Sequence, residues 1–432
     1  MRRPWKKAVV TGAVFGDEGK GKVVDDLAEA ADFVIRYMGG GNAGHTVVIG
    51  DRSYALHLLP SGIFRAGLTN VVGPGVAFEL KIGTHEIALA KAHGSTILLD
   101  MGAPVVLPIH RALDLGRELA ARSQAIGTTK QGIGPTYGDF WMRRGVRLGD
   151  LRSESRVREA LTRGGYWKEV LALGHFLDLD DCLAADSLSL GMDPMDLDAT
   201  VRWCMQHADV VCGHLADTRA IIQEADHEGK RLLFEGAQGI LLDTFQGTWP
   251  YCTSSLCTPA GVSATFGIYR FDRVIGITKA YATRVGSGPF PTELDDETGE
   301  QLRQRGHEFG TTTGRPRRCG WLDLPALRYA CRMGGVTELI ITKLDVLTGM
   351  NLFVATSYEE NDTRSSLTAE VMANAVPVYS AVPGWSQDIT TAKQWSDLPL
   401  AARGFVGKIE RETNVPVSGV SVGPERSQLI WT

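Results

Sequence analysis

The sequence predicts an α/β fold with a central, mostly parallel β-sheet flanked by helices, and three observations support this. Short apolar or β-branched runs recur along the 432 residues, segments with helical spacing separate them, and Gly-rich polar loops follow several of the runs. Strands that alternate with helices are typical of parallel sheets joined by helical crossovers. Because no internal repeat or low-complexity linker divides the chain, we expect one domain over residues 1–432, with long functional loops and a P-loop-like nucleotide-binding architecture.

The expected elements follow in chain order. Residues 7–12 (KAVVTG) are expected to form the first strand, because a β-branched run there ends in glycine. A Gly-rich loop, an amphipathic helix and a second strand are then expected, the last two at residues 21–30 and 31–40. Later strands are expected at residues 70–78, 96–102, 231–236, 273–282 and 338–347. Helices are expected at residues 160–176 and 323–333.

Composition excludes several classes of protein. Lys and Arg total 45 against 50 Asp and Glu, a net charge of −5, which gives no basic footprint for nucleic acid. No run of about 18 apolar residues is present, so we expect no membrane span. The basic start is not followed by the apolar core of a secretory signal. Seven cysteines without a CxxC pair suit a reducing cytoplasm.

A group of thiols and imidazoles lies in one predicted helical region, at Cys204, His207, Cys212 and His214. Their spacing fits no common zinc pattern. We therefore interpret the segment as helical packing with buried thiols.

The first candidate site is the segment GAVFGDEGKGK, residues 12–22. It departs from the strict phosphate-loop pattern, since Val14 stands at the expected first glycine and a glycine follows the lysine. A strand that feeds glycines into a helix N-terminus nevertheless presents free amides to an anion, and Lys20 could neutralise a phosphoryl group. Asp17 and Glu18 would repel a bare phosphate unless one of them binds Mg²⁺ or accepts a substrate proton. A plain Gly-rich turn with solvated acids is the alternative.

The second candidate site is GGGNAGHT, residues 39–46, directly after the second predicted strand. Its glycines allow the main chain to approach a ligand. Asn42 offers an amide for directional hydrogen bonds, and His45 can act as an acid or base near neutrality. Parallel sheets bind ligands at this end of their strands, which favours a functional histidine over a structural one.

The third and fourth candidate sites lie in the last third of the chain. TTTGRPRR, residues 311–318, combines hydroxyls with Arg315, Arg317 and Arg318, whose guanidinium groups can bind a carboxylate or phosphate through two bonds. In TKLDVL, Asp345 could accept from a guanine ring while the stem of Lys343 stacks on the base. The alternatives are a solvated basic turn and a chance Lys-x-Asp triplet.

Together these segments resemble the adenylosuccinate synthetase family. The resemblance runs in order through GDEGKGK, GNAGHT, GTTKQGIGPTY, RRGVRLGDL, FEGAQGILLD, YCTSS, TRVGSGPFPTE, EFGTTTGRPRRCGWLD and TKLDVL, and it ends near SVGPERSQLI. It implies a cytoplasmic homodimer that joins IMP and L-aspartate, with GTP and Mg²⁺, to give adenylosuccinate, GDP and phosphate.

The resemblance also implies a mechanism for the first loop. Asp17 would remove the N1 proton of IMP, so that O6 attacks the γ-phosphorus of GTP, and would hold Mg²⁺ together with the carbonyl of Gly44. Lys20 and His45 would stabilise the transferring phosphoryl group. The amine of aspartate would then displace phosphate from C6. A carboxylate with both tasks can lie among phosphates.

Further roles are implied position by position. The residues matched to the IMP site are Asn42, Thr129, Arg143, Gln238, Thr253 and Arg315, with Arg143 reaching into the partner subunit. The residues matched to the aspartate site are Thr311, Thr312, Thr313 and Arg315. The residues matched to the GTP site are Gly16, Gly19, Gly21, Gly44, Arg317, Lys343, Asp345, Ser421 and Gly423.

Several residues depart from the family pattern, including Val14, Met38, Gly41 and Gln131. They leave two alternatives open. The chain could be a paralogue that uses dGMP or another 6-oxopurine nucleotide, with ATP or GTP, or it could be an inactive nucleotide-binding regulator. Asp17 favours IMP, because the related phage branch that uses dGMP typically lacks this aspartate.

Overall fold

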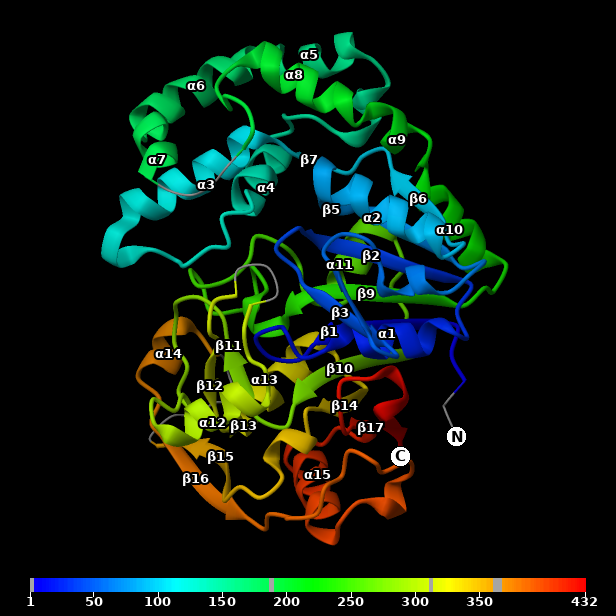
Figure 1. Ribbon diagram of the computed structural model, residues 1–432, viewed down its shortest axis with the longest axis vertical. Coiled ribbons are helices and arrows are strands. Elements are labelled where there is room, and N and C mark those ends of the chain that lie inside the picture. The colour runs from blue at the N-terminus through cyan, green and yellow to red at the C-terminus, as the bar shows by residue number, and fades with distance from the viewer. Residues whose placement is uncertain (1–3, 186–189, 311–313, 360–366) are drawn as a thin grey trace.

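The fold is taken from a computed structural model, which describes residues 4–185, 190–310, 314–359 and 367–432. One large sheet runs through the molecule in the order β18-β17-β14-β10-β1-β9-β2-β5-β6-β8, with β7 paired to β5 (Figure 1). Within the described ranges, no helix is long and apolar enough to span a bilayer.

The sheet is parallel throughout except at one edge, where β18 runs antiparallel to β17. The α/β fold with a mostly parallel sheet is therefore confirmed. Its strands are β1 (Lys7–Gly12), β2 (Phe33–Gly40), β5 (Thr69–Glu79), β6 (Thr96–Asp100), β7 (Val105–Val106), β8 (Leu215–Ala216), β9 (Leu232–Gly239), β10 (Arg273–Lys279), β14 (Glu338–Thr342), β17 (Val417–Ser421) and β18 (Leu429–Trp431).

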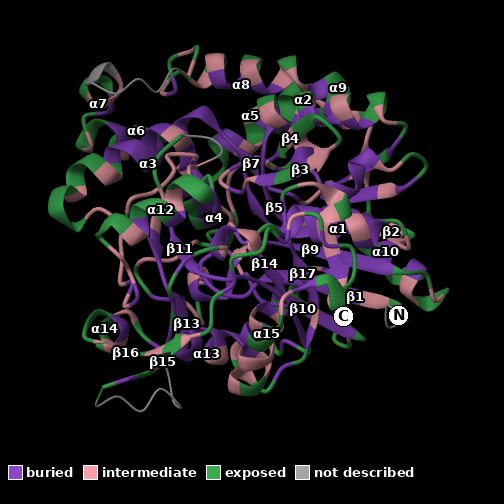
Figure 2. Ribbon diagram, turned by 60° about the horizontal axis from the view of Figure 1, so that its bottom comes forward, coloured by how far each residue is buried: buried purple, intermediate pink, exposed green. Residues whose placement is uncertain are grey.

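Helices cover both faces of the sheet, which is why its central strands are almost entirely buried (Figure 2). Val10 packs on one face against α1 (Lys20–Ala28). Its neighbour Val9 packs on the other face against α10 (Thr218–His227) and α11 (Ala260–Phe266). Strands buried on both faces become continuous apolar runs, and such runs are what the sequence displays.

The remaining elements lie around this sheet, and several of them extend the molecule beyond its two ends (Figure 1). The helices are α2 (Leu80–Ala92), α3 (Pro108–Ala121), α4 (Ile133–Trp141), α5 (Glu154–Thr162), α6 (Tyr166–Phe176), α7 (Leu179–Ala185), α8 (Leu197–Gln206), α9 (Ala208–Cys212), α12 (Glu297–Arg305), α13 (Leu324–Gly334), α14 (Ala369–Ala373) and α15 (Leu400–Thr413). The smaller sheets contain β3 (His45–Ile49), β4 (Arg52–Leu56), β11 (Ala282–Arg284), β12 (Arg318–Gly320), β13 (Leu322–Asp323), β15 (Leu352–Tyr358) and β16 (Pro377–Val382).

Several of the predicted elements were wrong in extent, among them the strand expected at residues 273–282, which ends at Lys279. The helix expected at residues 160–176 is divided between α5 and α6, because Gly164 and Gly165 have φ values of 63° and 80°, which are left-handed. The strand expected at residues 338–347 ends at Thr342, and a short 3₁₀ turn, Asp345–Leu347, follows.

Because the parallel strands run in one direction, their carboxyl ends meet at one edge of the sheet. The loops that follow these ends carry the candidate residues.

Candidate active site

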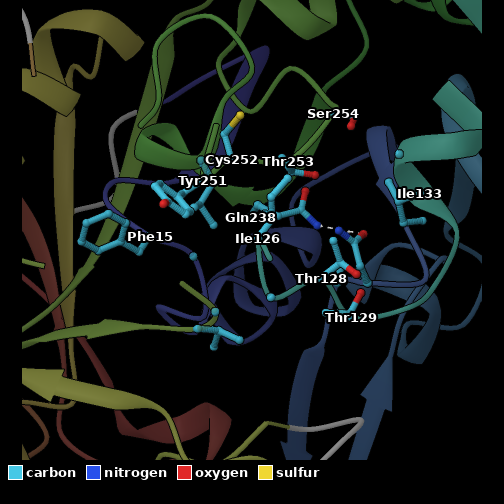
Figure 3. A pocket seen from close by; sticks show the side chains of 18 of the residues that line it. Phe15, Ile126, Thr128, Thr129, Ile133, Gln238, Tyr251, Cys252, Thr253 and Ser254 are labelled. Carbon is cyan, nitrogen blue, oxygen red and sulfur yellow. Dashed lines mark hydrogen bonds between the residues drawn. The ribbon is translucent and has the colours of Figure 1, made fainter. Parts of the chain in front are cut away.

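A cavity of about 330 Å³ lies at the carboxyl ends of β1, β2 and β9. Figure 3 shows Phe15 and Tyr251 at one end of it, with Thr128 and Ile133 at the other. Its walls come from segments far apart in the sequence, so the fold assembles the predicted residues. The predicted residues that line it are Gly16, Asp17, Lys20, Asn42, Gly44, His45, Thr129, Gln238 and Thr253.

The first loop uses its two acids differently. Glu18 is buried, and its Oε1 accepts from the main-chain N–H of Val14 at 3.1 Å and of Gly16 at 2.7 Å. Asp17 has a left-handed φ of 59°, and its side chain is 31% exposed at the cavity. Glu18 thus closes the loop from inside, while Asp17 remains available to a ligand. The interpretation of both acids as solvated therefore fails for Glu18.

Lys20 begins α1, directly after Gly19, whose φ of 86° turns the chain into the helix. The Nζ atom of Lys20 donates to the carbonyl of Gln238 at 2.7 Å, and it lies 3.4 Å from Glu18 Oε2. Gln238 in turn donates through Nε2 to Oδ1 of Asn42 at 3.1 Å, the dashed contact in Figure 3. The loops that follow β1, β2 and β9 are therefore joined side by side around the cavity.

His45 belongs to a buried polar cluster behind the cavity wall. Its Nδ1 contacts Oε1 of Glu235, and Arg36 Nη1 lies 2.8 Å from the same nitrogen and 3.2 Å from the carboxylate. Ser61 donates to Glu235 through its main-chain N–H at 2.7 Å and its hydroxyl at 2.8 Å. These contacts fix the position of the imidazole ring at the edge of the cavity.

Charge in this cluster is set by burial and by close partners. Burial and the guanidinium of Arg36 lower the pKa of His45 to about 4. Burial opposes ionisation of Glu235, but His45 and Arg36 outweigh it and hold the pKa of this carboxyl below its usual value. At neutral pH the cluster therefore holds a neutral imidazole, a carboxylate and a guanidinium, and a phosphoryl group placed against the ring would favour its protonation.

The lowered pKa of His45 predicts part of the acid sensitivity of the protein. An unfolded chain protonates this histidine below its ordinary pKa of 6.5, whereas the folded chain resists protonation until about 4. Stability is therefore lost as pH falls through this window, by about 1.4 kcal/mol per pH unit. We expect His45→Gln to show a shallower decline in unfolding free energy between about pH 6.5 and pH 5 than wild type, measured by denaturant titration at each pH. Equal slopes in the two proteins would contradict this assignment.

Arg317 lies against the loop that carries Asp17. Its Nε is 3.0 Å from Oδ2 of Asp17, and its Nη1 donates to Oε2 of Glu308 at 2.7 Å. Burial opposes ionisation of Glu308, but Lys279 and Arg317 outweigh it and lower the pKa of its carboxyl to about 2. The predicted phosphate-binding arginine is thus held beside Asp17 by a buried anion.

The predicted guanine-reading residues lie outside this cavity, at the carboxyl ends of β14 and β17. Asp345 is half-buried, and this burial raises the pKa of its carboxyl. Across the described ranges, its Oδ1 atom is buried without a hydrogen-bond partner. Lys343 donates to the carbonyl of Gly306 at 2.8 Å, and Ser421 donates to that of Gly423 at 3.0 Å. An orphaned buried acceptor of this kind fits a ligand that brings its own N–H donors.

Other predicted residues are not brought into the cavity. Arg143 and Arg315 are exposed and do not line it. Arg318, which we grouped with the substrate-binding arginines, is instead bonded to Glu293, with 2.7 Å between Nε and Oε1. It also donates to the carbonyl of Gly288 at 2.8 Å, so its role is to hold two loops together. Thr311, Thr312 and Thr313 lie outside the described residues.

Sequence reasoning missed the residues that hold the functional ones. Arg36, Glu235 and Ser61 surround His45, and Glu308 holds Arg317. A signal was present for two of them, since Arg36 interrupts an apolar strand and Glu235 follows one directly. Charged residues in such places are rarely buried without a partner.

The cavity offers the carboxylate of Asp17 and the main-chain carbonyl of Gly44 as candidate ligands for Mg²⁺. The described ranges contain no cluster of three or more His, Cys, Asp and Glu side chains that could hold an ion. Mg²⁺, however, usually takes one or two carboxylates together with substrate phosphates, and Asp17 and Gly44 both line the cavity. Of the thiol and imidazole group in α8 and α9, Cys204 is buried in the core, and burial raises its pKa to about 12.

Comparisons with known proteins agree along the whole chain. The family model described as adenylosuccinate synthetase matches residues 9–430. The chain is 47% identical over 437 residues to the adenylosuccinate synthetase of Citrifermentans bemidjiense, covering 98% of this chain and 97% of that protein. It is 43% identical over 431 residues to that of Carboxydothermus hydrogenoformans, covering 98% of each.

Two solved structures are also similar. The fully ligated adenylosuccinate synthetase from Plasmodium falciparum matches with a TM-score of 0.88 at 33% identity, over 99% of this chain and 100% of that one. The succinoaminodeoxyadenylate synthetase of cyanophage S-2L, bound to dGMP and dATP, matches with a TM-score of 0.63 at 20% identity, over 100% and 96% of the two chains. The second likeness shows a shared fold.

Proposed function

The chain belongs to the adenylosuccinate synthetase family, and we propose that the cavity between the first two loops is where it performs that family's reaction. It is a ligase that forms a C–N bond, joining IMP and L-aspartate at the expense of GTP, with Mg²⁺, in purine nucleotide synthesis. The observation that carries the proposed site is the convergence of Asp17, Lys20, His45 and Gln238 on one cavity.

Asp17 is the proposed base. Its partly exposed carboxylate lies at the cavity, so it can take the N1 proton of IMP and leave charge on O6. That oxygen then attacks the γ-phosphorus of GTP, and the resulting 6-phosphoryl group leaves as phosphate when the amine of aspartate adds at C6. Asp17 and the carbonyl of Gly44 would hold Mg²⁺, which would neutralise phosphate charge.

Lys20 and His45 are proposed to stabilise the transferring phosphoryl group. Lys20 Nζ lies at the N-terminus of α1, where free amides and the helix dipole favour an anion. His45 is held by Glu235 so that its ring remains at the cavity edge. Both groups therefore act on charge that develops during transfer.

The IMP pocket is proposed to extend between two walls of the cavity. Asn42, Gln238, Thr129 and Thr253 supply polar groups to it. Arg143, at the end of α4, is proposed to complete the pocket of the partner subunit in a homodimer. The exposed side chains of Trp141 and Met142, 68% and 59% accessible, support an interface there, because large apolar side chains on a surface commonly mark contacts between chains.

L-aspartate is proposed to bind Arg315 together with Thr311, Thr312 and Thr313. GTP is proposed to bind Gly16, Gly19, Gly21 and Gly44 with its phosphates and Arg317, and Lys343, Asp345, Ser421 and Gly423 with its base. We further infer a cytoplasmic location, where these nucleotides are made, and a single domain over residues 1–432, since one sheet takes strands from both ends of the chain.

The departures from the family pattern do not favour the alternative functions. Val14 and Met38 are buried in the hydrophobic core, with 8% and 5% of their surface exposed. They therefore pack the loops from behind. Asp17, Lys20 and His45 are all in place at the cavity, so an inactive regulator has little support.

The direct test follows product absorbance when purified protein is mixed with IMP, L-aspartate, GTP and Mg²⁺. We expect turnover with IMP to exceed turnover with dGMP, and GTP to exceed ATP as phosphoryl donor. If the protein forms no adenylosuccinate but accepts dGMP in place of IMP, the proposed function is wrong and the paralogue function is correct.

Asp345→Asn tests the proposed guanine site. Its buried Oδ1 has no partner in the described ranges, so a guanine that donates from N1 and the exocyclic amine would satisfy it. Loss of a charged hydrogen bond of this kind should raise KM for GTP by about a hundredfold. The KM for IMP should change little. Xanthosine triphosphate should become a better donor, because its C2 oxygen can accept from the new amide. Unchanged nucleotide preference would contradict the assignment.

A further inference from the structure

A buried chain of alternating charges runs beneath the loop that carries Arg315. Arg317 bridges Asp17 and Glu308, at 3.0 Å and 2.7 Å, and Lys279 Nζ reaches the same Oε2 of Glu308 at 2.7 Å. Tyr281 donates its hydroxyl to the other oxygen, Oε1, at 2.5 Å. Both Lys279 and Glu308 are almost completely buried, at 2% and 0% exposure.

Glu308 and Arg317 are the two ends of one hairpin. The main-chain N–H of Arg317 donates to the carbonyl of Glu308 at 2.9 Å, and Phe309 pairs with Pro316 just above. Gly310 donates to the carbonyl of Arg315 at 2.8 Å. The Glu308 carboxylate therefore joins the hairpin ends through their side chains as well as through the main chain.

The same carboxylate ties the hairpin to the sheet. Lys279 is the last residue of β10, and its Nζ also donates to Thr283 at 2.7 Å. β10 is the neighbour of β1, the strand that leads into the loop of Asp17. Glu308 is thus the point at which the hairpin, the sheet and, through Arg317, the catalytic loop are joined.

We propose that Glu308 is a positioning residue for the aspartate and triphosphate steps, acting through Arg317 and the hairpin that carries Arg315. This inference rests on the proposed function, in which Arg315 binds L-aspartate and Arg317 faces GTP. Glu308 does not line the cavity and need not touch a substrate. Its task is to fix the distance between two guanidinium groups and Asp17, and small displacements of such groups are costly.

The test is Glu308→Gln, which keeps the size of the side chain and removes its charge. We expect KM for L-aspartate to rise by at least about tenfold, since misplacing a positioned group by 1 Å can cost about a hundredfold in rate. KM for GTP should rise as well, because Arg317 loses its buried partner. KM for IMP should rise less, by no more than about threefold, because Arg315 is the one residue of the proposed IMP set on this hairpin and the others lie on other loops.

Glu338→Gln is the matched control. Glu338 forms a buried ion pair with Arg273 at the opposite end of β10, with contacts of 2.5 Å and 2.7 Å. Its removal leaves an unpaired buried cation in the same strand, so its cost in stability should be similar. We expect its KM for L-aspartate to remain within about twofold of wild type, because distant sites act independently.

The outcomes are distinct. A folded Glu308→Gln protein with unchanged KM for L-aspartate and GTP would overturn the inference, and so would an equal rise in Glu338→Gln. If Glu308→Gln does not fold, the double variant Glu308→Gln/Lys279→Met removes the unpaired ammonium. This variant should show the same rise in KM for L-aspartate. A wild-type KM for L-aspartate in the double variant would also overturn the inference. Absence of product from wild-type protein would instead contradict the proposed function.

Discussion

Asp17→Asn should lower kcat by at least about a thousandfold, since it removes a general base that is also a proposed metal ligand. An amide of the same size cannot take the N1 proton of IMP, and it is a poorer ligand for Mg²⁺ than a carboxylate. Because Asp17 is partly exposed and its loop is closed by the buried Glu18, the fold should tolerate the change. The measurement is steady-state turnover with IMP, L-aspartate and GTP all saturating.

The control for this variant is an aspartate far from the cavity. Asp209, exposed on α9, can be changed to asparagine, and turnover should stay within about twofold of wild type, as for most surface changes. Thermal unfolding and IMP binding should be close to wild type in both proteins. An Asp17→Asn enzyme that kept more than about a tenth of wild-type kcat would rule out Asp17 as the base.

The central sheet could be predicted because each strand is marked by the residues of its own short segment. β1, β2, β10 and β14 are buried on both faces, so each contains a short apolar run, and polar loops follow these runs. The break between α5 and α6 was missed because the apolar spacing continues across Gly164 and Gly165, although paired glycines favour a turn. Both glycines have left-handed φ values, which glycine adopts readily.

The residues that line the cavity could also be predicted from the sequence, whereas the buried residues that hold them in place could not. Lys20, Asn42 and His45 follow strand ends in Gly-rich loops, and that pattern is visible in one sequence. Glu235 became significant only through topology, because β9 lies between β1 and β2 and its register places Glu235 opposite Arg36. Glu308 likewise depends on Lys279, which reaches it from β10. Pairings across a sheet are not contained in local spacing.

Arg143 is the residue that each subunit is proposed to contribute to the site of its partner. It is exposed at the end of α4, with a left-handed φ of 61°, and lies outside the cavity of its own chain. An arginine that completes a neighbouring active site would have this placement, since guanidinium groups bind phosphates through paired bonds. If the proposed homodimer forms, each cavity needs Asp17 from one subunit and Arg143 from the other.

Mixing two inactive variants tests this arrangement. Arg143→Leu alone should lower kcat/KM for IMP by about a hundredfold, the cost of a charged contact to phosphate. When Arg143→Leu and Asp17→Asn proteins exchange subunits in equal amounts, about half of the dimers should be mixed, and each mixed dimer regains one intact site. Activity should therefore return to about a quarter of the wild-type value, because one site in four is complete.

The matching control replaces one partner in the mixture. Asp17→Asn protein mixed with the double variant Asp17→Asn/Arg143→Leu contains no subunit with an intact Asp17, so no exchange can restore a site. Activity in the first mixture and none in the second would require the two side chains to act across an interface. Two results would contradict the shared site. One is full activity of Arg143→Leu alone, and the other is no recovery of activity in a mixture whose subunits have demonstrably exchanged. Either result would show that Arg143 is a surface residue without a role in the partner's site.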